Sequence, residues 1–100
     1  MRPELQFIIA PDHPSIAGHF PGRPVVPGIV LLNEAIALLL RNWPERRVAA
    51  LREVKFLSPV IPGDAVTIDV IEMAPDRMSF VGRVGQQGVF RARVELDVAE

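Results

Sequence analysis

Five of the ten prolines in this 100-residue chain fall between residues 11 and 27. Proline fixes φ and has no amide hydrogen to donate, so such a segment forms neither a helix nor a central strand. We therefore predict one long ordered loop over residues 12–26. A loop of this length is uncommon in so small a domain and usually carries function.

The proline-rich loop runs directly into an apolar segment. Ten of the twelve residues from Ile29 to Leu40 are apolar, and leucine and alanine, which favour helix, dominate the second half. Pro27 suits the first position of a helix, and Arg41 suits its C-terminal end. A helix that is apolar on nearly every face should be buried on most sides. We expect either the sheet to wrap around this helix or a second subunit to cover the rest.

The other segments have the patterns of strands and turns. Strands are predicted at residues 5–9, 49–60, 66–70, 78–84 and 90–98, with turns at 62–64, 74–77 and 85–88. In the last strand apolar and charged residues alternate, so one face is buried and the other is wetted. Short turns make neighbouring strands antiparallel. The sequence therefore predicts a single α+β domain over residues 1–100, an antiparallel sheet packed with one long helix.

Charge and cysteine content exclude several classes of protein. The net charge of −1 lacks the basic excess that is typical of nucleic-acid binders, and the absence of cysteine excludes disulfides and thiolate metal sites. The longest nearly apolar stretch, residues 29–40, is too short to span a bilayer as a helix, and no secretory signal is visible. We expect a cytoplasmic protein with no nucleic-acid partner and no membrane insertion.

Candidate chemistry is concentrated where the loop meets the helix. His19 lies in the loop, and the first helical amides, those of Gly28 and Ile29, lack intrahelical partners. These amides lie at the positive end of the helix dipole and can hold a carbonyl oxygen or an oxyanion. A histidine beside them could enolise a carbonyl compound that has an apolar tail. From residue types alone, the alternative is a histidine that only hydrogen-bonds the loop backbone.

Residues 19–28, His-Phe-Pro-Gly-Arg-Pro-Val-Val-Pro-Gly, closely resemble the signature of the hot-dog fold 3-hydroxyacyl-acyl carrier protein dehydratases. The resemblance continues through the apolar helix and into residues 54–64, which end in Pro-Gly-Asp. It implies a hot-dog fold, with an antiparallel sheet wrapped around one long central helix. It also implies that water is removed from a 3-hydroxyacyl thioester to give a trans-2-enoyl thioester.

The resemblance also implies roles for individual residues. His19 would remove the proton next to the thioester carbonyl, and the amide of Gly28 would polarise that carbonyl. Phe20, Pro27 and Ile29 would complete the substrate-binding site. The substrate would be an acyl carrier protein or CoA thioester, with no cofactor and no metal. The protein would be a homodimer or a dimer-based oligomer, because this family builds its sites between subunits.

The catalytic acid is where this sequence departs from the family. The family places Glu or Asp 14 residues after the histidine, and here that position is Asn33. Glu34 follows, but successive helix residues point about 100° apart, and an ion pair with Arg41 is its alternative role. Asn33 can hydrogen-bond a hydroxyl but cannot deliver a proton as a carboxylic acid does. We retain Asn33 as the second catalytic position.

Two other functions therefore stay open. One is a non-catalytic acyl-carrier binding subunit, or the partner of a composite dehydratase, and the other is a hot-dog thioesterase. A basic rim formed by Arg23, Arg41, Arg46, Arg47 and Arg52 is either ordinary surface charge or a dock for an acidic carrier. A metal site at Asp12, His13 and His19 matches no established spacing.

Overall fold

The structure is a computed structural model that describes residues 5–10 and 25–98. Most of the proline-rich loop, with His19 and Phe20, therefore lies outside the described residues. The elements, in chain order, are β1 (Leu5–Ile8), α1 (Gly28–Asn42), β2 (Arg46–Phe56), β3 (Ala65–Ala74), β4 (Arg77–Val84) and β5 (Gln87–Val98). No helix within these residues is long and apolar enough to cross a membrane.

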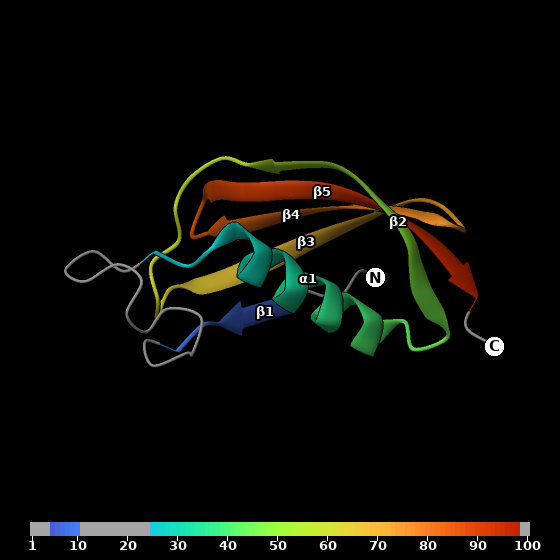
Figure 1. The fold of residues 1–100 in the computed structure, drawn as a ribbon, viewed down its shortest axis with the longest axis horizontal. Coiled ribbons are helices and arrows are strands. Elements are labelled where there is room, and N and C mark those ends of the chain that lie inside the picture. Colours follow the sequence, from blue (N-terminus) through green and yellow to red (C-terminus); the bar gives the residue numbers. More distant parts are fainter. Residues whose placement is uncertain (1–4, 11–24, 99–100) are drawn as a thin grey trace.

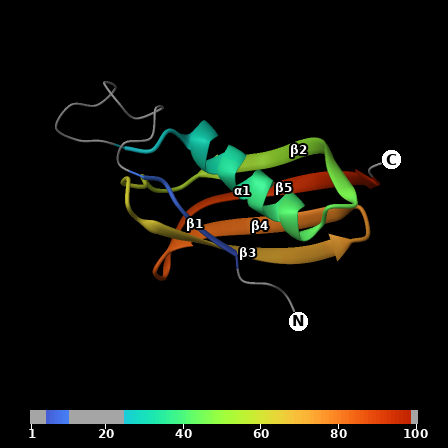
Figure 2. The ribbon, with the colours of Figure 1, turned by 90° about the horizontal axis from the view of Figure 1, so that it is seen from below.

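The five strands form one antiparallel sheet in the order β1-β3-β4-β5-β2, which leaves β1 and β2 at its two edges. The sheet curves over α1, which lies along one of its faces (Figure 1). Figure 2, seen from below, shows the helix crossing in front of the strands. The α+β arrangement with one helix is confirmed.

The core lies between α1 and the sheet face that it covers. Phe80 and Phe90 meet edge to face there, with ring centroids 6.1 Å apart, and both are at most 1% exposed. The predicted alternation of β5 is confirmed, because Ala92 and its apolar neighbours are buried while Arg91 is exposed. Val89 is buried as well, since the register skips it between the pairs Gly82–Phe90 and Arg83–Gly88.

The predicted bounds of β2 are wrong by three to four residues. The strand begins at Arg46 and ends at Phe56, whereas the pattern predicted residues 49–60. It ends because the amides of Leu57 and Ser58 both donate to the carbonyl oxygen of Val89, at 2.8 and 3.3 Å, and the chain then leaves the sheet. Within β2 the register shifts between Arg52 and Lys55, which marks a β-bulge.

The turn after this segment is the predicted Pro-Gly-Asp turn. Gly63 has φ of +95°, a conformation that glycine adopts without strain. The amide of Gly63 donates to the carbonyl oxygen of Ile9 at 2.8 Å. The turn therefore connects the end of β1 to the segment that enters β3.

Helix α1 begins one residue later than predicted. Pro27 is the N-cap residue, with φ of −58° and ψ of 141°, so its extended ψ excludes it from the helix proper. Its carbonyl oxygen accepts hydrogen bonds from the amides of Val30 and Leu31, at 3.0 and 3.3 Å. At the other end the amide of Trp43 caps the carbonyl oxygen of Leu39, and the Trp43 side chain packs against the core, as expected.

The two faces of α1 differ in burial. The face toward the sheet is buried and consists of Leu31, Leu32, Ala35 and Leu39. The face away from the sheet is exposed at Ile29, Asn33 and Ala37, and Ile29 is 61% exposed. The expectation that most sides of the helix are buried is therefore wrong for one chain by itself, because the sheet covers only one side.

Candidate functional site

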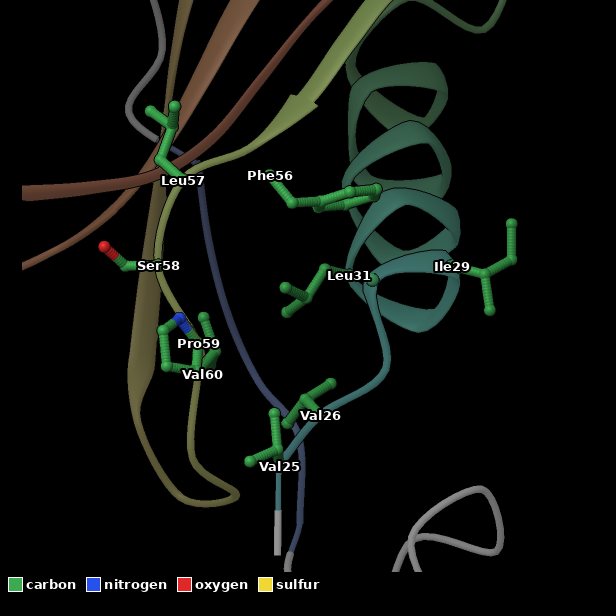
Figure 3. Close-up of a pocket in the computed structure, with 10 residues that line it drawn as sticks. Val25, Val26, Ile29, Leu31, Phe56, Leu57, Ser58, Pro59 and Val60 are labelled. Atoms are coloured by element: carbon green, nitrogen blue, oxygen red, sulfur yellow. The ribbon is translucent and has the colours of Figure 1, made fainter.

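An apolar cavity of about 500 Å³ lies beside the first turn of α1 (Figure 3). Three segments surround it: the residues before the helix, the first helical turn, and the end of β2 with the residues that follow. The lining residues are Val25, Val26, Gly28, Ile29, Leu31, Phe56, Leu57, Ser58, Pro59 and Val60. Ser58 is the single polar side chain among them, so the cavity suits an apolar ligand.

A backbone hydrogen bond fixes two walls of the cavity relative to each other. The amide of Val26 donates to the carbonyl oxygen of Val60 at 2.8 Å. The two side chains are 3% and 1% exposed, so this contact is part of the core. The chain that enters α1 is thereby held against the chain that leaves β2, and the site is anchored to the sheet.

The cavity explains why the first helical residue is a glycine. A Cβ built on Gly28 would lie 2.8 to 3.0 Å from three atoms of the Phe56 ring. Figure 3 shows this ring extending from the end of β2 to the first turn of the helix. The ring is packed so closely on the helix backbone that any larger residue at this position would require the ring to move.

Two backbone amides at this end of the helix have no hydrogen-bond acceptor among the described residues. The amides of Val30 and Leu31 donate to Pro27, whereas the described residues provide no backbone acceptor for those of Gly28 and Ile29. Gly28 and Ile29 both line the cavity. Free amides at the positive end of a helix dipole stabilise a carbonyl oxygen that gains negative charge. An apolar acyl compound with its carbonyl beside Gly28 matches this arrangement.

The Ser58 hydroxyl does not point toward the helix. Its oxygen accepts a hydrogen bond from the side-chain amide of Gln87 at 3.0 Å. Figure 3 shows this oxygen pointing away from α1. Ser58 therefore helps to position the end of β2 and contributes no polar group near Gly28.

Asn33 is not among the residues that line the cavity. It lies one turn beyond Ile29 on the exposed side of α1. Glu34 is half-buried, and the ion pairs between described residues include none between Glu34 and Arg41. Within one chain, Gly28 and Ile29 line the cavity, whereas neither Pro27 nor Asn33 is among its lining residues.

Several candidates lie outside the described residues, namely His19 and Phe20 of the proposed site and the Asp12–His13–His19 group. Residues 5–10 and 25–98 contain no group of three metal-ligating side chains that could hold an ion. Three members of the basic rim form ion pairs within the chain: Arg46 with Glu45, Arg47 with Asp97, and Arg52 with Glu95.

The wall formed by Phe56, Leu57, Pro59 and Val60 was not predicted from the sequence. A signal was present, because residues 54–64 are part of the resemblance to the dehydratases. Their pattern was interpreted only as a strand and a turn. The contact between Phe56 and Gly28 joins two residues that are 28 positions apart, and no local pattern predicts it.

One helix along a five-stranded antiparallel sheet of order β1-β3-β4-β5-β2 is the hot-dog fold. Within this fold, the chain belongs to the ApeI-like family, whose model, described as ApeI dehydratase, matches residues 2–92. The resemblance identified from the loop and helix is thereby confirmed at the level of the family.

Curated relatives carry the name 3-hydroxyacyl-(acyl-carrier-protein) dehydratase FabZ. The protein from Chlamydia trachomatis serovar D is 37% identical over 68 residues, which are 57% of this chain and 44% of the relative. The protein from Solibacter usitatus is 30% identical over 97 residues, which are 85% of this chain and 59% of the relative. The chain thus spans about half the length of the curated relatives that it matches.

Solved structures support the fold. A chain of the dehydratase heterocomplex ApeI:P from Xenorhabdus doucetiae matches with a TM-score of 0.78 and 20% identity, over 93% of this chain and 84% of that one. A mutant of the fluoroacetyl-CoA-specific thioesterase FlK matches with a TM-score of 0.71 and 16% identity, over 98% and 88% of the two chains. The hot-dog fold is therefore shared by a dehydratase and a thioesterase.

Proposed function

We propose that this protein removes water from a 3-hydroxyacyl thioester to give a trans-2-enoyl thioester. The observation that carries the proposal is the apolar cavity of about 500 Å³ at the helix N-terminus, beside the available amides of Gly28 and Ile29. The loop that contains His19 leads directly into this end of the helix. An acyl chain fits the apolar walls, and the thioester carbonyl is expected beside the amides.

In this mechanism the His19 imidazole takes the proton from C2 of the substrate. The electron pair of that C–H bond forms the enolate, whose oxygen accepts hydrogen bonds from the amides of Gly28 and Ile29. The enolate then forms the C2–C3 double bond as the C3–O bond breaks. The leaving hydroxyl needs a proton, and the imidazolium of His19 is the donor that this chain offers, because Asn33 cannot act as an acid.

Asn33 has a different role in this proposal. It can hydrogen-bond the leaving hydroxyl and orient it, but it lies on the exposed side of α1, outside its own chain's cavity. We propose that the protein is a dimer or a dimer-based oligomer, in which Asn33 of one subunit faces the cavity of its partner. The acyl group is carried either by acyl carrier protein or by CoA, and an assay with both thioesters distinguishes the two.

A composite dehydratase is the second candidate. Its specific support is Asn33 in place of an acid, together with an exposed helix face that one chain leaves uncovered. The name of one structural neighbour describes a dehydratase that is a heterocomplex, which makes such an assembly reasonable for this fold. In that case a different hot-dog subunit would supply the acid.

The deciding experiment is an assay of the purified protein with short panels of 3-hydroxyacyl and acyl thioesters, on both CoA and a carrier protein. Enoyl thioester formation, measured by mass spectrometry, is the expected result. His19→Ala should lower the rate by roughly 10²- to 10⁴-fold, which is the usual contribution of a general base. His13→Ala, in the same loop, is the matched control and should retain the rate.

Other results of this assay would favour a different function. Release of a free thiol without enoyl product would favour a thioesterase. An inactive protein that still binds acyl carrier protein, and becomes active when mixed with a second hot-dog subunit, would favour the composite dehydratase. A rate that is unchanged in His19→Ala would remove His19 from the mechanism.

A further inference from the structure

The sheet face that points away from α1 carries an uncompensated pair of cations. Lys55 of β2 and Arg91 of β5 are direct cross-strand partners. Both are exposed, and neither side chain has an ion pair or hydrogen bond within the described part of the chain. Like charges directly opposite each other in a sheet repel and destabilise it.

The adjacent cation pair on the same two strands shows how such repulsion is relieved within the chain. Arg52 and Arg93 are also direct cross-strand partners. Here Arg52 forms an ion pair with Glu95, and Arg93 forms one with Glu53 at 3.3 Å. Two carboxylates therefore neutralise this pair, whereas none neutralises Lys55 and Arg91.

The other carboxylates that the structure describes on this face are already ion-paired, and Asp97 of β5 binds Arg47 at 3.9 Å. Asp69 of β3, which is two strands away from Arg91, binds Arg83 at 2.7 Å. Glu53 and Glu95 are engaged as described. Lys55 and Arg91 are therefore left without a carboxylate partner within the described chain, and an anion from solution can approach both.

A hollow of about 690 Å³ lies between these two cations and the neighbouring strand β4. The bulge in β2 contributes to it, because Glu53 adopts φ of 54° and the register shifts there. The hollow, which we call the outer-face hollow, is lined by Glu53, Val54, Lys55, Ser79, Val81, Arg91, Ala92 and Arg93. Ser79 adds a hydroxyl, and Val81 adds an apolar surface next to Arg91.

We propose that the outer-face hollow binds a phosphate-bearing small molecule, with its phosphate between Lys55 and Arg91. Lysine and arginine are the side chains that bind phosphate oxygens most strongly, and the Ser79 hydroxyl can donate a further hydrogen bond. The rest of the molecule would lie over Val81. This site lies on the sheet face opposite α1, so it does not depend on the thioester chemistry proposed for the cavity.

The test measures binding of inorganic pyrophosphate by calorimetry and by NMR shifts of backbone amides. The expected result is saturable binding with a dissociation constant of about 1 mM or lower, that is, at least about 4.1 kcal/mol. The largest amide shifts should occur at Lys55 and Arg91. ADP is titrated in parallel, because tighter binding of ADP would identify a nucleotide, and equal binding would identify the phosphate group alone.

The variant Lys55→Gln/Arg91→Gln should bind pyrophosphate at least tenfold more weakly. The control variant Arg47→Gln/Arg77→Gln removes the same total charge from two residues that are ion-paired within the chain, and it should bind within twofold of the wild type. In the absence of ligand, Lys55→Gln alone should raise the melting temperature, since it removes the repulsion with Arg91.

Three results would overturn the proposal. One is that pyrophosphate produces no saturable shifts. Another is that both double variants lose affinity equally, which would indicate a diffuse effect of net charge. The third is that Lys55→Gln leaves the melting temperature unchanged or lowers it, because the cation pair would then carry no repulsion to relieve.

Discussion

The two faces of α1 both carry apolar residues but lie in opposite environments. The sheet-facing side consists of leucine and alanine residues that are at most 6% exposed. The opposite side also carries apolar residues, yet Ile29 is 61% exposed and Ala37 is exposed as well. The difference shows that the sheet does not account for all of the apolar residues of this helix.

The uncovered side of α1 lies beside the cavity. Three of the residues that line the cavity, Ile29, Phe56 and Leu57, are large apolar side chains that are between 47% and 61% exposed. Exposed apolar side chains that gather around one cavity mark an interaction site. The core-facing side therefore stabilises the chain, and the opposite side is expected to bind a partner subunit.

Leu39→Ala should have the largest effect on the fold. Leu39 is 1% exposed, and truncating a fully buried leucine lowers the free energy of unfolding by about 2–5 kcal/mol. The measurement is urea denaturation followed by circular dichroism. Leu40→Ala, at the half-buried neighbouring position, is the control and should lose less than half as much. Equal losses would contradict the assignment of the two faces.

Ile29→Asp should instead weaken assembly. A charge in an apolar interface raises the dissociation constant of the oligomer at least about tenfold, or about 1.4 kcal/mol. The stability of one chain should change by less than about 0.5 kcal/mol, because the site is exposed. Ile8→Asp is a matched control, because Ile8 is 60% exposed but lies on the edge strand β1 and not on α1.

Sedimentation velocity measures this effect. A well-folded wild-type monomer at micromolar concentration would contradict the oligomer outright. Equal dissociation in Ile29→Asp and Ile8→Asp would show that the interface is not on the helix side.

Much of the fold could be predicted from local patterns. Alternation in residues 90–98 correctly identified the buried face of β5, and the apolar run after Pro27 correctly identified the helix. The predicted end of β2 was wrong because the strand ends where the amides of Leu57 and Ser58 donate to the carbonyl oxygen of Val89. Val89 lies more than thirty residues away in the sequence. Local sequence does not encode such long-range hydrogen bonds.

The candidate site was only partly predictable for the same reason. The free amides of Gly28 and Ile29 follow from the geometry of any helix N-terminus, and they were identified in advance. The wall that contains Phe56 was missed, because it is created by a tertiary contact with Gly28. The position of Asn33 relative to the cavity also required the structure, since the sequence assigns it a helix face but no neighbour.

Gly28→Ala tests the contact that shapes the cavity. The new Cβ would force the Phe56 ring aside, but that ring is 50% exposed and can move, so the loss of stability should be about 1 kcal/mol. A double-mutant cycle with Phe56→Leu should reveal a coupling of at least about 0.5 kcal/mol. Gly88→Ala is the control, because its Cβ would meet Leu57 at an ordinary 3.6 Å. Additive losses at positions 28 and 56 would contradict the contact.

Asn33→Asp should have the smallest effect on the fold and a specific effect on chemistry. The side chain is exposed in one chain, so the substitution should change stability by less than about 0.5 kcal/mol. A carboxylic acid at this position can protonate the departing hydroxyl, whereas the amide can only hydrogen-bond it. If the missing acid limits the reaction, the rate of dehydration of a 3-hydroxyacyl thioester should rise at least about tenfold.

Glu34→Gln is the companion variant for this test. Glu34 points about 100° away from Asn33 around the helix, so its loss should leave dehydration unchanged in both the wild type and Asn33→Asp. A rate that falls in Glu34→Gln would make Glu34 the acid. A wild type that dehydrates efficiently and is slowed by Asn33→Asp would give the amide its own catalytic role. Because Asn33 lies outside its own chain's cavity, any rate effect of either sign should disappear when the protein is diluted until its subunits separate.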